Sequence, residues 1–510
     1  MYKRYYFLLI CMLITSILLC ACQKEEVPVQ KSTEIPTEEL NIFILGDAFT
    51  VFYASENKKE VIYTTYMNLG EYESTICYGE EGFLFYDAFN QYQQQNGIRL
   101  NLHWYQYPDE LEKALLTMDK EELPDIIITN YSTTGDFYQY MKQGFFYDIT
   151  SYTEAEELYT SDEYYNLVLE AGRLNGKQYI LPILFNIDTL MGCEKNWNIL
   201  ELNEKTAESH EQLMNVVLQA QRERQLQEVI GQWIAYTAYY TPYALYDAAG
   251  ERWIDYEKEN VSLNKQRFYQ MAEFYRNFLQ EQFGEVQIGQ DLLWEKTKHM
   301  EARKATEKYM EEYIDNKGCI IEGGGAFQGF IHNAAAQAWY YESRYQDMGE
   351  EFRLMAIPGA AQGTTAHVSC FGGVLSTSKH PEEAYNFLRY LMDTEIFCGF
   401  GISVNKENVS KMLANLSKLE YELRYGCQPL KEDGTPYTGD GDYIIHPMTK
   451  ETKESLEKML ENITSVSLPD WPVYEILRKQ LEKYGKGEIS VEIAYETAYH
   501  QLENYLKERK

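Results

Sequence analysis

The sequence predicts an α/β protein, because short apolar strand patterns alternate with amphipathic helix patterns from residue 40 onwards. Strand, helix, strand, helix and strand follow one another within residues 40–129, which is typical of a sheet with parallel strands. The chain has 510 residues, enough for about three compact units or two large ones. Its content of 45% hydrophobic and 15% aromatic residues is ample for extended cores and far from that of disordered chains.

Periodicity identifies the elements of this first part. The run Leu40–Leu45 is apolar except for Asn41 and is expected to be a buried strand that ends at Gly46-Asp47. Apolar residues at 85, 88, 89 and 92 have the i, i+3, i+4, i+7 spacing of one helix face. Three further elements follow in order: an alternating strand over 98–104, a polar helix over 109–119 and an apolar strand over 125–129.

The later part is mostly helical over residues 205–315, with long runs at 211–228 and 265–282, and then alternates again. Short strands are predicted at 319–321, 352–357 and 368–375. Pro381 begins the next helix, where its missing N–H costs nothing, and the inner face of that helix carries Ala384, Leu388 and Leu391. The last helix opens near Ser490 and is expected to bury one face, made of Val491, Ala494, Ala498, Leu502 and Tyr505.

The composition is strongly acidic, with 79 Asp and Glu against 46 Lys and Arg and a formal net charge of −33. Such a surface repels phosphate backbones, whereas nucleic-acid affinity comes largely from neutralising phosphates. We therefore expect no nucleic-acid partner. The 45 Tyr can bury their rings and still present hydroxyls, which suits polar, flat-faced ligands. A compositional bias of the genome explains the high Tyr count equally well.

The N-terminal segment has the pattern of a secretory signal. Two basic residues, Lys3 and Arg4, precede the apolar run Phe7–Leu19, which is shorter than a typical transmembrane helix. The next residues, Leu19-Cys20-Ala21-Cys22, resemble the bacterial lipobox.

The lipobox resemblance implies that Cys22 becomes the N-terminus after cleavage and carries a diacylglycerol thioether and palmitate. We therefore expect a signal peptide over 1–21, a flexible tether over 22–39, and a protein lipid-anchored to the extracytoplasmic face of the cell membrane. An ordinary signal peptide cut near Ala21 and an uncleaved anchor are the alternatives.

The other cysteines and the histidines form no metal-binding motif. Six cysteines beyond Cys22 are widely spaced without a CxxC pair, and the eight His form neither HxH nor HExxH. The sequence also has no phosphate-loop or nucleophile-elbow motif. We expect no metal, no cofactor and no catalytic residue, and either buried free thiols or one or two disulfides.

Seven short segments occur in an order that resembles the extracellular solute-binding proteins of ABC importers, specifically the carbohydrate-binding family that includes maltose-binding protein. Each segment is weak alone, but their common order behind a lipobox is specific, and it covers residues 80–510. The segments are Leu123–Ile128, Gly144–Thr150, Leu174–Pro182, Lys317–Gly323, Gly372–Ser376 with the helix after it, Gly401–Lys406 and the C-terminal part from Tyr484.

The resemblance implies a two-lobed periplasmic-binding-protein fold, in which hinge strands join two discontinuous α/β lobes and the ligand lies in the cleft between them. Crossings are expected near Pro182, Ile357 and Ser403. Lobe 1 would comprise 40–183 plus 358–403, and lobe 2 would comprise 184–357 plus 404–510. Residues 48–80 and 418–450 depart from the family pattern as insertions.

The resemblance also points to ligand-contacting residues in lobe 1 and at the hinge. Tyr131 and Ser132 follow the strand at 125–129 in a loop that supplies polar and aromatic contacts, although they also suit an ordinary turn. Asp47 ends the first strand and could accept hydrogen bonds from sugar hydroxyls, but a turn residue needs no function. Asn186 both donates and accepts, which suits sugar hydroxyls; capping of the hinge strand would explain it as well.

The candidates in lobe 2 are aromatic residues and a glycine run. Trp233 and Tyr236 could stack on the apolar face of a pyranose, but aromatics at helical spacing are more often core residues. Gly325 closes a three-glycine run that allows a close backbone approach to a ligand, and Phe327 behind it is a stacking candidate. Phe371 is a weaker one.

These features predict a non-enzymatic protein that captures a mono- or oligosaccharide in the cleft and delivers it to ABC permease subunits, and we expect a monomer. A protein of the same fold that binds a polyamine or peptide, or that serves a sensor, is the main alternative, because the acidic surface would attract cations. A lipid-anchored glycoside hydrolase is a remoter one, since its chemistry needs two carboxylates roughly 5 to 9 Å apart.

Overall fold

The computed structural model describes most of the chain from residue 38 onwards. The described residues are 38–45, 52–54, 61–63, 76–77, 86–105, 108–119, 123–130, 136–199, 201, 203, 205, 207–222, 250, 252–283, 327–328, 334–347, 349–359, 362–395, 401–418, 421–423, 443–468 and 470–508.

A mixed sheet, here called the main sheet, forms the centre of the first lobe. Its order is β16-β9-β15-β6-β1-β5, and β19 pairs with one end of β15. The strands are β1 (Glu38–Leu45), β5 (Ile98–Tyr105), β6 (Ile126–Asn130), β9 (Ile180–Ile187), β15 (Thr364–Val374), β16 (Ile402–Ser403) and β19 (Ile463–Ser467). β1 runs parallel to β5 and β6, and β15 parallel to β19, whereas β15 is antiparallel to β6 and β9, and β16 to β9.

Helices cover both faces of the main sheet, so successive residues of β1 point into different cores. Leu40, Ile42 and Ile44 belong to the large core, beneath α2 (Tyr86–Asn96) and α16 (Pro381–Asp393). Phe43 and Leu45 point to the opposite face of β1 and lie in a smaller core with Leu111 of α3 (Pro108–Thr117). This double burial explains why the strand reads as an apolar run.

Two glycines of β15 allow close packing at the centre of the sheet. A Cβ on Gly372 would lie 2.3 Å from Leu388 of α16, and one on Gly373 would lie 2.5 Å from Phe146. The absence of side chains here lets α16 approach on one side and the segment before α5 (Thr150–Ala155) on the other.

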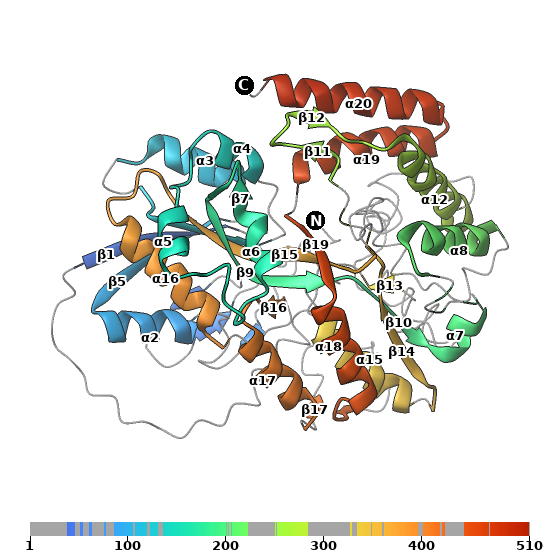
Figure 1. Ribbon diagram of the computed structural model, residues 1–510, viewed down its shortest axis with the longest axis horizontal. Helices are drawn as coiled ribbons and strands as arrows, with labels where there is room; N and C mark the ends of the chain where they lie inside the picture. Colours follow the sequence, from blue (N-terminus) through green and yellow to red (C-terminus); the bar gives the residue numbers. More distant parts are fainter. Residues whose placement is uncertain are drawn as a thin grey trace, which may run out of the picture.

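A second sheet, β13-β10-β14, forms the centre of the other lobe. Its strands are β10 (Thr189–Cys193), β13 (Phe327–Gln328) and β14 (Phe352–Ala356), all antiparallel to their neighbours. The helices beside it are α7 (Glu194–Ile199), α15 (Ala334–Asp347), α17 (Lys406–Leu416) and α18 (Lys450–Glu461). In Figure 1 this sheet lies to the right of the main sheet.

Four helices pack together beyond the second sheet and are here called the helical layer. They are α8 (His210–Arg222), α12 (Lys265–Phe283), α19 (Trp471–Gly485) and α20 (Val491–Glu508). The hairpin β11 (Ile254–Asp255) and β12 (Asn260–Val261) contacts α20. Figure 1 shows α20 along the top of the molecule, with its C-terminal end above α4 (Phe137–Lys142) of the first lobe.

The remaining elements are short. Asn175 and Gly176 both have positive φ (53° and 76°) in the turn between β7 (Arg173–Leu174) and β8 (Lys177–Gln178), as a two-residue type I′ hairpin requires. The other short elements are α6 (Asn166–Leu169), a 3₁₀ turn (Glu170–Gly172), β2 (Phe52–Ala54), β3 (Val61–Tyr63), β4 (Ile76–Cys77), β17 (Tyr421–Leu423) and β18 (Tyr443–Ile445). β2 to β4 lie within the expected insertion 48–80.

Most elements expected from periodicity are present within a few residues of their predicted bounds. The helix face Ala384, Leu388 and Leu391 is fully buried. Of the five α20 residues that were expected on its buried face, four are buried and Val491 is partly buried. The sheet is not purely parallel, because β15, a strand from late in the sequence, lies beside β6 and runs antiparallel to it. The strand expected at 319–321 lies outside the described residues.

Candidate functional site

The chain passes between the two sheets at neighbouring points, here called the strand crossing. Asp188 is the single residue between β9 of the main sheet and β10 of the second sheet. The return passage runs from β14 through Ile357 and Pro358 to β15. The backbone N–H of Ile357 donates to the carbonyl of Asp188 at 3.0 Å, so the two passages are hydrogen-bonded to each other.

Polar side chains are buried at the strand crossing. The Nε2 atom of His367, on β15, lies 2.8 Å from Oδ2 of Asp188, and the two side chains are 4% and 3% exposed. Two residues earlier on β15, Thr365 shares a 2.7 Å hydroxyl contact with Ser465 of β19. These side chains lie on one face, because residues two apart in a strand point the same way. Leaving a buried polar group without its partner is costly, so this contact stabilises the crossing.

His210 lies against the same crossing from the helical layer. It is the first residue of α8, and its side chain interacts with the backbone of Pro358. Burial, reinforced by the charge of Arg267, lowers the pKa of His210 from 6.5 to about 3. The imidazole is therefore neutral at any physiological pH.

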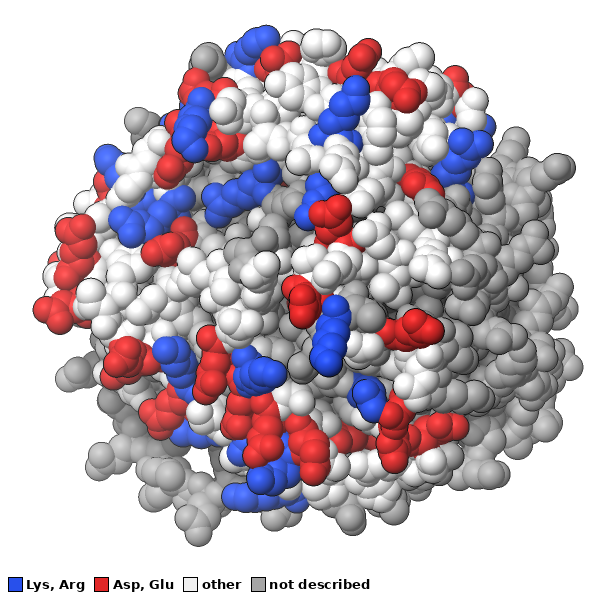
Figure 2. Space-filling model, turned by 45° about the vertical axis from the view of Figure 1, so that its right-hand side comes forward, with Lys and Arg blue, Asp and Glu red and all other residues white. Residues whose placement is uncertain are grey.

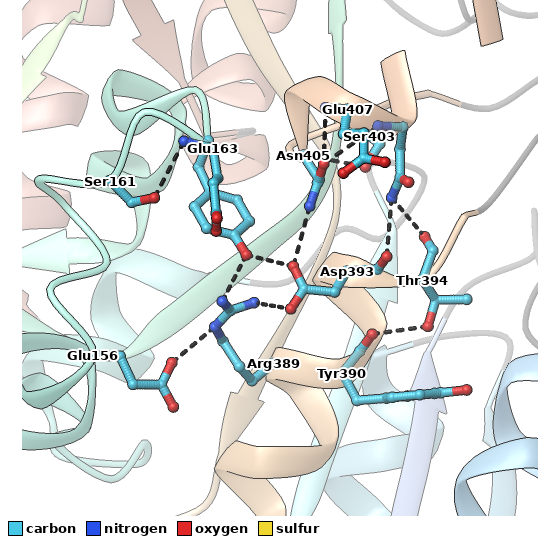
Figure 3. Close-up of polar contacts among 12 residues, drawn as sticks. Glu156, Ser161, Glu163, Arg389, Tyr390, Asp393, Thr394, Ser403, Asn405 and Glu407 are labelled. Carbon is cyan, nitrogen blue, oxygen red and sulfur yellow. Dashed lines mark hydrogen bonds and ion pairs between the residues drawn. The ribbon is translucent and has the colours of Figure 1, made fainter. Parts of the chain in front are cut away.

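A third connection leaves the main sheet at β16 and enters α17, and a polar network centred on Arg389 supports it (Figure 3). Arg389 donates to Glu156 at 2.8 Å, to Asp393 at 2.6 Å and to the hydroxyl of Tyr164 at 2.6 Å. The hydroxyl of Tyr164 in turn donates to Asp393.

Asn405 joins this network to the start of α17. Its amide donates to Asp393 at 3.2 Å, and its side-chain oxygen accepts from the N–H groups of Glu407 at 2.9 Å and Asn408 at 3.3 Å. It thus caps α17 while holding the helix end to α16. The geometry of this cluster is that of a structural anchor.

A group of aromatic and acidic side chains joins α4 to the helical layer and the β11–β12 hairpin; it is here called the tyrosine cluster and comprises Asp136, Tyr138, Tyr256, Asp470 and Tyr505. The hydroxyl of Tyr505, on α20, donates to Oδ1 of Asp136 at 2.8 Å. Tyr256 donates to Asp470 at 2.7 Å, and its oxygen lies 3.4 Å from that of Tyr505. The rings of Tyr138 and Tyr256 stack, with centroids 4.3 Å apart and planes 10° from parallel.

The tyrosine cluster lies near the edge of the main sheet where ligands bind in open α/β folds. Asp136 caps α4, accepting from the N–H of Gln139, six residues after the carboxyl end of β6. Ligands of open α/β sheets are held by loops at this edge. Burial, together with the charges of Asp470 and Asp136, raises the pKa of Tyr505 well above its ordinary value. The phenol therefore stays a proton donor.

Contacts beside the tyrosine cluster also join the β11–β12 hairpin to α4 and to the β7–β8 turn. Lys142 of α4 lies 2.5 Å from Glu259, and the backbone N–H of Asn175 donates to Glu257 at 3.2 Å. The guanidinium of Arg252 lies 6.0 Å from the ring centre of Tyr138. The hairpin is thus held to α4 and to the β7–β8 turn by charge, ring and backbone contacts.

Of the eight main ligand candidates, two fall in the described part of the chain. Asn186 lies in β9, where its side chain is 0% exposed. Phe327 opens β13 and pairs with Leu190 of β10, so both residues belong to the strands next to Asp188. The other candidates, Asp47, Tyr131, Ser132, Trp233, Tyr236 and Gly325, and the lipid-attachment candidate Cys22, lie outside the described residues. Phe371, the weaker candidate, is buried with its ring 4.8 Å from that of Phe137.

Sequence reasoning missed Asp188, His367 and the tyrosine cluster. Asp188 does carry a signal, since it is a lone acid between two apolar strand runs. The partners of Tyr505 and Tyr256 lie more than 200 residues away along the chain, and no spacing reports such a contact.

The described surface mixes charges of both signs. On the face shown in Figure 2, Lys and Arg side chains lie beside Asp and Glu side chains. Within the described residues, no group of three or more His, Cys, Asp or Glu could hold a metal ion. No helix in that part of the chain is long and apolar enough to cross a bilayer.

Two sheets joined by a double strand crossing, with a third connection through β16, define a two-lobed α/β protein of the periplasmic-binding-protein fold. The family model described as bacterial extracellular solute-binding protein matches residues 87–398, more than half of the chain. The chain belongs to this family, and the resemblance read from the sequence is confirmed.

Solved structures of the same fold cover nearly the whole chain. The galacto-N-biose-/lacto-N-biose I-binding protein of the ABC transporter from Bifidobacterium longum, in complex with lacto-N-biose, is 14% identical with a TM-score of 0.51, covering 93% of this chain and 98% of its own. An ABC substrate-binding protein from Listeria monocytogenes in complex with cycloalternan is 14% identical with a TM-score of 0.50, covering 92% and 99%.

A periplasmic solute-binding protein from Pectobacterium atrosepticum is 12% identical with a TM-score of 0.52, covering 93% and 100%. No curated protein matches the chain at a significant level. At these identities the structural likeness concerns the fold alone.

Proposed function

We propose that this protein captures a carbohydrate in a cleft between its two lobes and delivers it to the permease subunits of an ABC importer. The observation that carries the proposal is the double strand crossing in a chain of the solute-binding family. Two lobes joined only by a few strands can rotate toward each other and close the cleft. A solute that contacts both lobes selects this closed form. The lobe boundaries of this proposal are 40–183 plus 358–403 and 184–357 plus 404–510, with β19 of the last range returning to pair with β15 of the main sheet.

Two arguments support a sugar over other solutes. Two binding proteins of the same fold hold a cycloalternan and lacto-N-biose, and the candidates Tyr131, Trp233, Tyr236 and Phe327 are aromatic, which suits the apolar faces of pyranose rings. Asn186 and Ser132 would supply hydrogen bonds to hydroxyls. In this role the chain catalyses no reaction, acts as a monomer and leaves ATP hydrolysis to other subunits.

A thermal-shift experiment tests the solute class. The purified chain without residues 1–22 is melted against mono- and oligosaccharides, with spermidine and a peptide pool as the competing classes. A ligand that binds only the native state adds about 2.7 kcal/mol at a hundredfold excess over Kd. We expect one sugar class to raise the melting temperature; a rise with spermidine or peptide alone would refute the carbohydrate assignment.

We further propose that Cys22 carries the lipid anchor, on the strength of the Leu19–Cys22 sequence. Replacement Cys22→Ser should release the protein from the membrane fraction and abolish palmitate labelling, whereas Cys20→Ser should change neither. Membrane retention of Cys22→Ser would contradict the anchor and leave the solute-binding role untouched.

A further inference from the structure

We propose that the tyrosine cluster is a latch that holds the two lobes closed, with Tyr505 on the last helix binding Asp136 at the edge of the solute cleft. The inference rests on the proposed solute-binding function and adds a device that sets how readily the cleft opens. The contacts that carry it join α4 to α20 and to the β11–β12 hairpin.

The positions of these residues support a closing role. Tyr505 and Tyr256 extend from lobe 2, whereas Asp136 and Tyr138 belong to α4 of lobe 1. None of them lies on a strand that crosses between the sheets. A rotation can therefore separate the two sides of the cluster while the β9–β15 and β10–β14 ladders stay paired, with β19, which pairs with β15 and ends three residues before Asp470, as a further hinge strand.

The chemistry of the contact gives it the strength of a latch. Tyr505 donates to a carboxylate, and hydrogen bonds to charged groups are about twice as strong as neutral ones. Asp136 and Tyr505 are only 7% and 8% exposed, so water competes poorly for them while the lobes stay closed. On opening, both groups regain water, which keeps the contact reversible.

The neighbouring contacts orient the latch. Tyr256 is fixed by Asp470 at 2.7 Å and lies against Tyr505, and its ring stacks on Tyr138 across the boundary. The ion pair between Lys142 and Glu259 adds an attraction at the rim. The closed arrangement thus has a hydrogen bond, a ring stack and a charge pair made by side chains, together with the contact from the backbone N–H of Asn175 to Glu257.

Removal of one hydroxyl tests the latch. Tyr505→Phe keeps the ring and deletes the hydrogen bond to Asp136. The control is Tyr495→Phe on the same helix, which deletes a 3.2 Å hydrogen bond to the carbonyl of Leu263 within lobe 2. The radius of gyration of each solute-free chain is measured by small-angle X-ray scattering, and circular dichroism verifies folding.

We expect Tyr505→Phe to expand the solute-free chain and Tyr495→Phe to leave it as compact as the wild type. Should Tyr505→Phe not fold, Asp136→Asn serves instead, because it weakens the same hydrogen bond from the other side and keeps a side chain that can cap α4; the same expansion is expected. Equal radii for the wild type and the latch variant would overturn the proposal, as would equal expansion in Tyr495→Phe.

The solute affinity provides a second arm. With the sugar identified by thermal shift, Tyr505→Phe should weaken binding by about tenfold, the loss expected for one hydrogen bond to a charged group, because a smaller fraction of the chain is closed. Unchanged affinity would overturn the latch while leaving the function standing. If no sugar binds, the proposed function fails, and the solute-free radii still decide whether the cluster holds the lobes together.

Discussion

The strand crossing and the tyrosine cluster both join the elements around the main sheet to the rest of the molecule, and the two places differ in what holds them. At the crossing, backbone ladders and a buried Asp188–His367 pair join segments that are covalently continuous. At the tyrosine cluster, hydroxyls, rings and a charge pair join elements that are distant in the chain. The first kind of contact resists change, whereas the second can part and form again, so one serves as a pivot and the other as a closure.

The largest expected effect sharpens this contrast at the crossing. His367→Ala leaves the carboxylate of Asp188, which is 3% exposed, without its partner. Leaving a buried polar group without its partner costs about 1 to 3 kcal/mol, and more where the group is charged, measured as a lower midpoint in urea denaturation. His500→Ala is the matched control, because its 3.2 Å contact with Glu503 lies on the exposed side of α20 and should matter little. Equal losses of unfolding free energy from the two substitutions would show that the buried Asp188–His367 contact contributes no more to stability than an exposed contact does.

Acid should weaken the crossing before it affects the hydroxyls of the tyrosine cluster. The pKa of His210 falls from 6.5 to about 3 in the folded chain, so between these values the unfolded chain binds a proton that the folded chain refuses. This contribution to stability is complete above pH 6.5 and is lost as the pH falls toward 3, by at most about 1.4 kcal/mol per pH unit. The tyrosines, whose pKa values are raised, stay protonated throughout.

Urea denaturation between pH 7 and pH 4 checks the sign. His210→Gln should show a shallower decline in unfolding free energy than the wild type. A parallel decline in both proteins would mean that other groups dominate the acid response.

The smallest expected effect concerns the rim of the tyrosine cluster. Lys142 and Glu259 are 23% and 38% exposed, and such pairs contribute at most about 1 kcal/mol. Lys142→Met should lower the unfolding free energy by less than this in dilute buffer and by nothing measurable at high salt, where the pair is screened. A loss that persists at high salt would indicate that packing of the Lys142 stem, and not its charge, joins the hairpin to α4.

The comparison also shows what could be predicted from the sequence. Burial of one or both faces of an element leaves a recognisable pattern of apolar residues in the sequence. This pattern predicted the strands at Leu40–Leu45 and 125–129 and the helix face at Ala384, Leu388 and Leu391. The antiparallel entry of β15 was not, since periodicity carries no information on pairing direction. Asp136 and Tyr505 were not recoverable as partners for the same kind of reason: their contact joins residues 369 apart, and each alone suits a turn or a helix core.

The candidate ligand residues divide in a similar way. Asn186 could be placed by its neighbours in an apolar strand, and it lies beside the crossing. The roles of Tyr131, Ser132, Trp233, Tyr236, Gly325, Phe327 and Asp47 rest on resemblance and stay predictions, because a side chain that contacts a solute need not leave any repeating pattern in the sequence.

The position of β15 in the main sheet has a consequence for how the protein comes to be folded. This strand lies between β6 and β9, yet it is made more than 170 residues after β9 ends. Until residue 374 is available, β6 and β9 lack the neighbour that pairs with both. Pairing between such distant segments is slow, so the first lobe cannot mature before residue 374 has been made, and until then the edges of β6 and β9 stay open to wrong pairing.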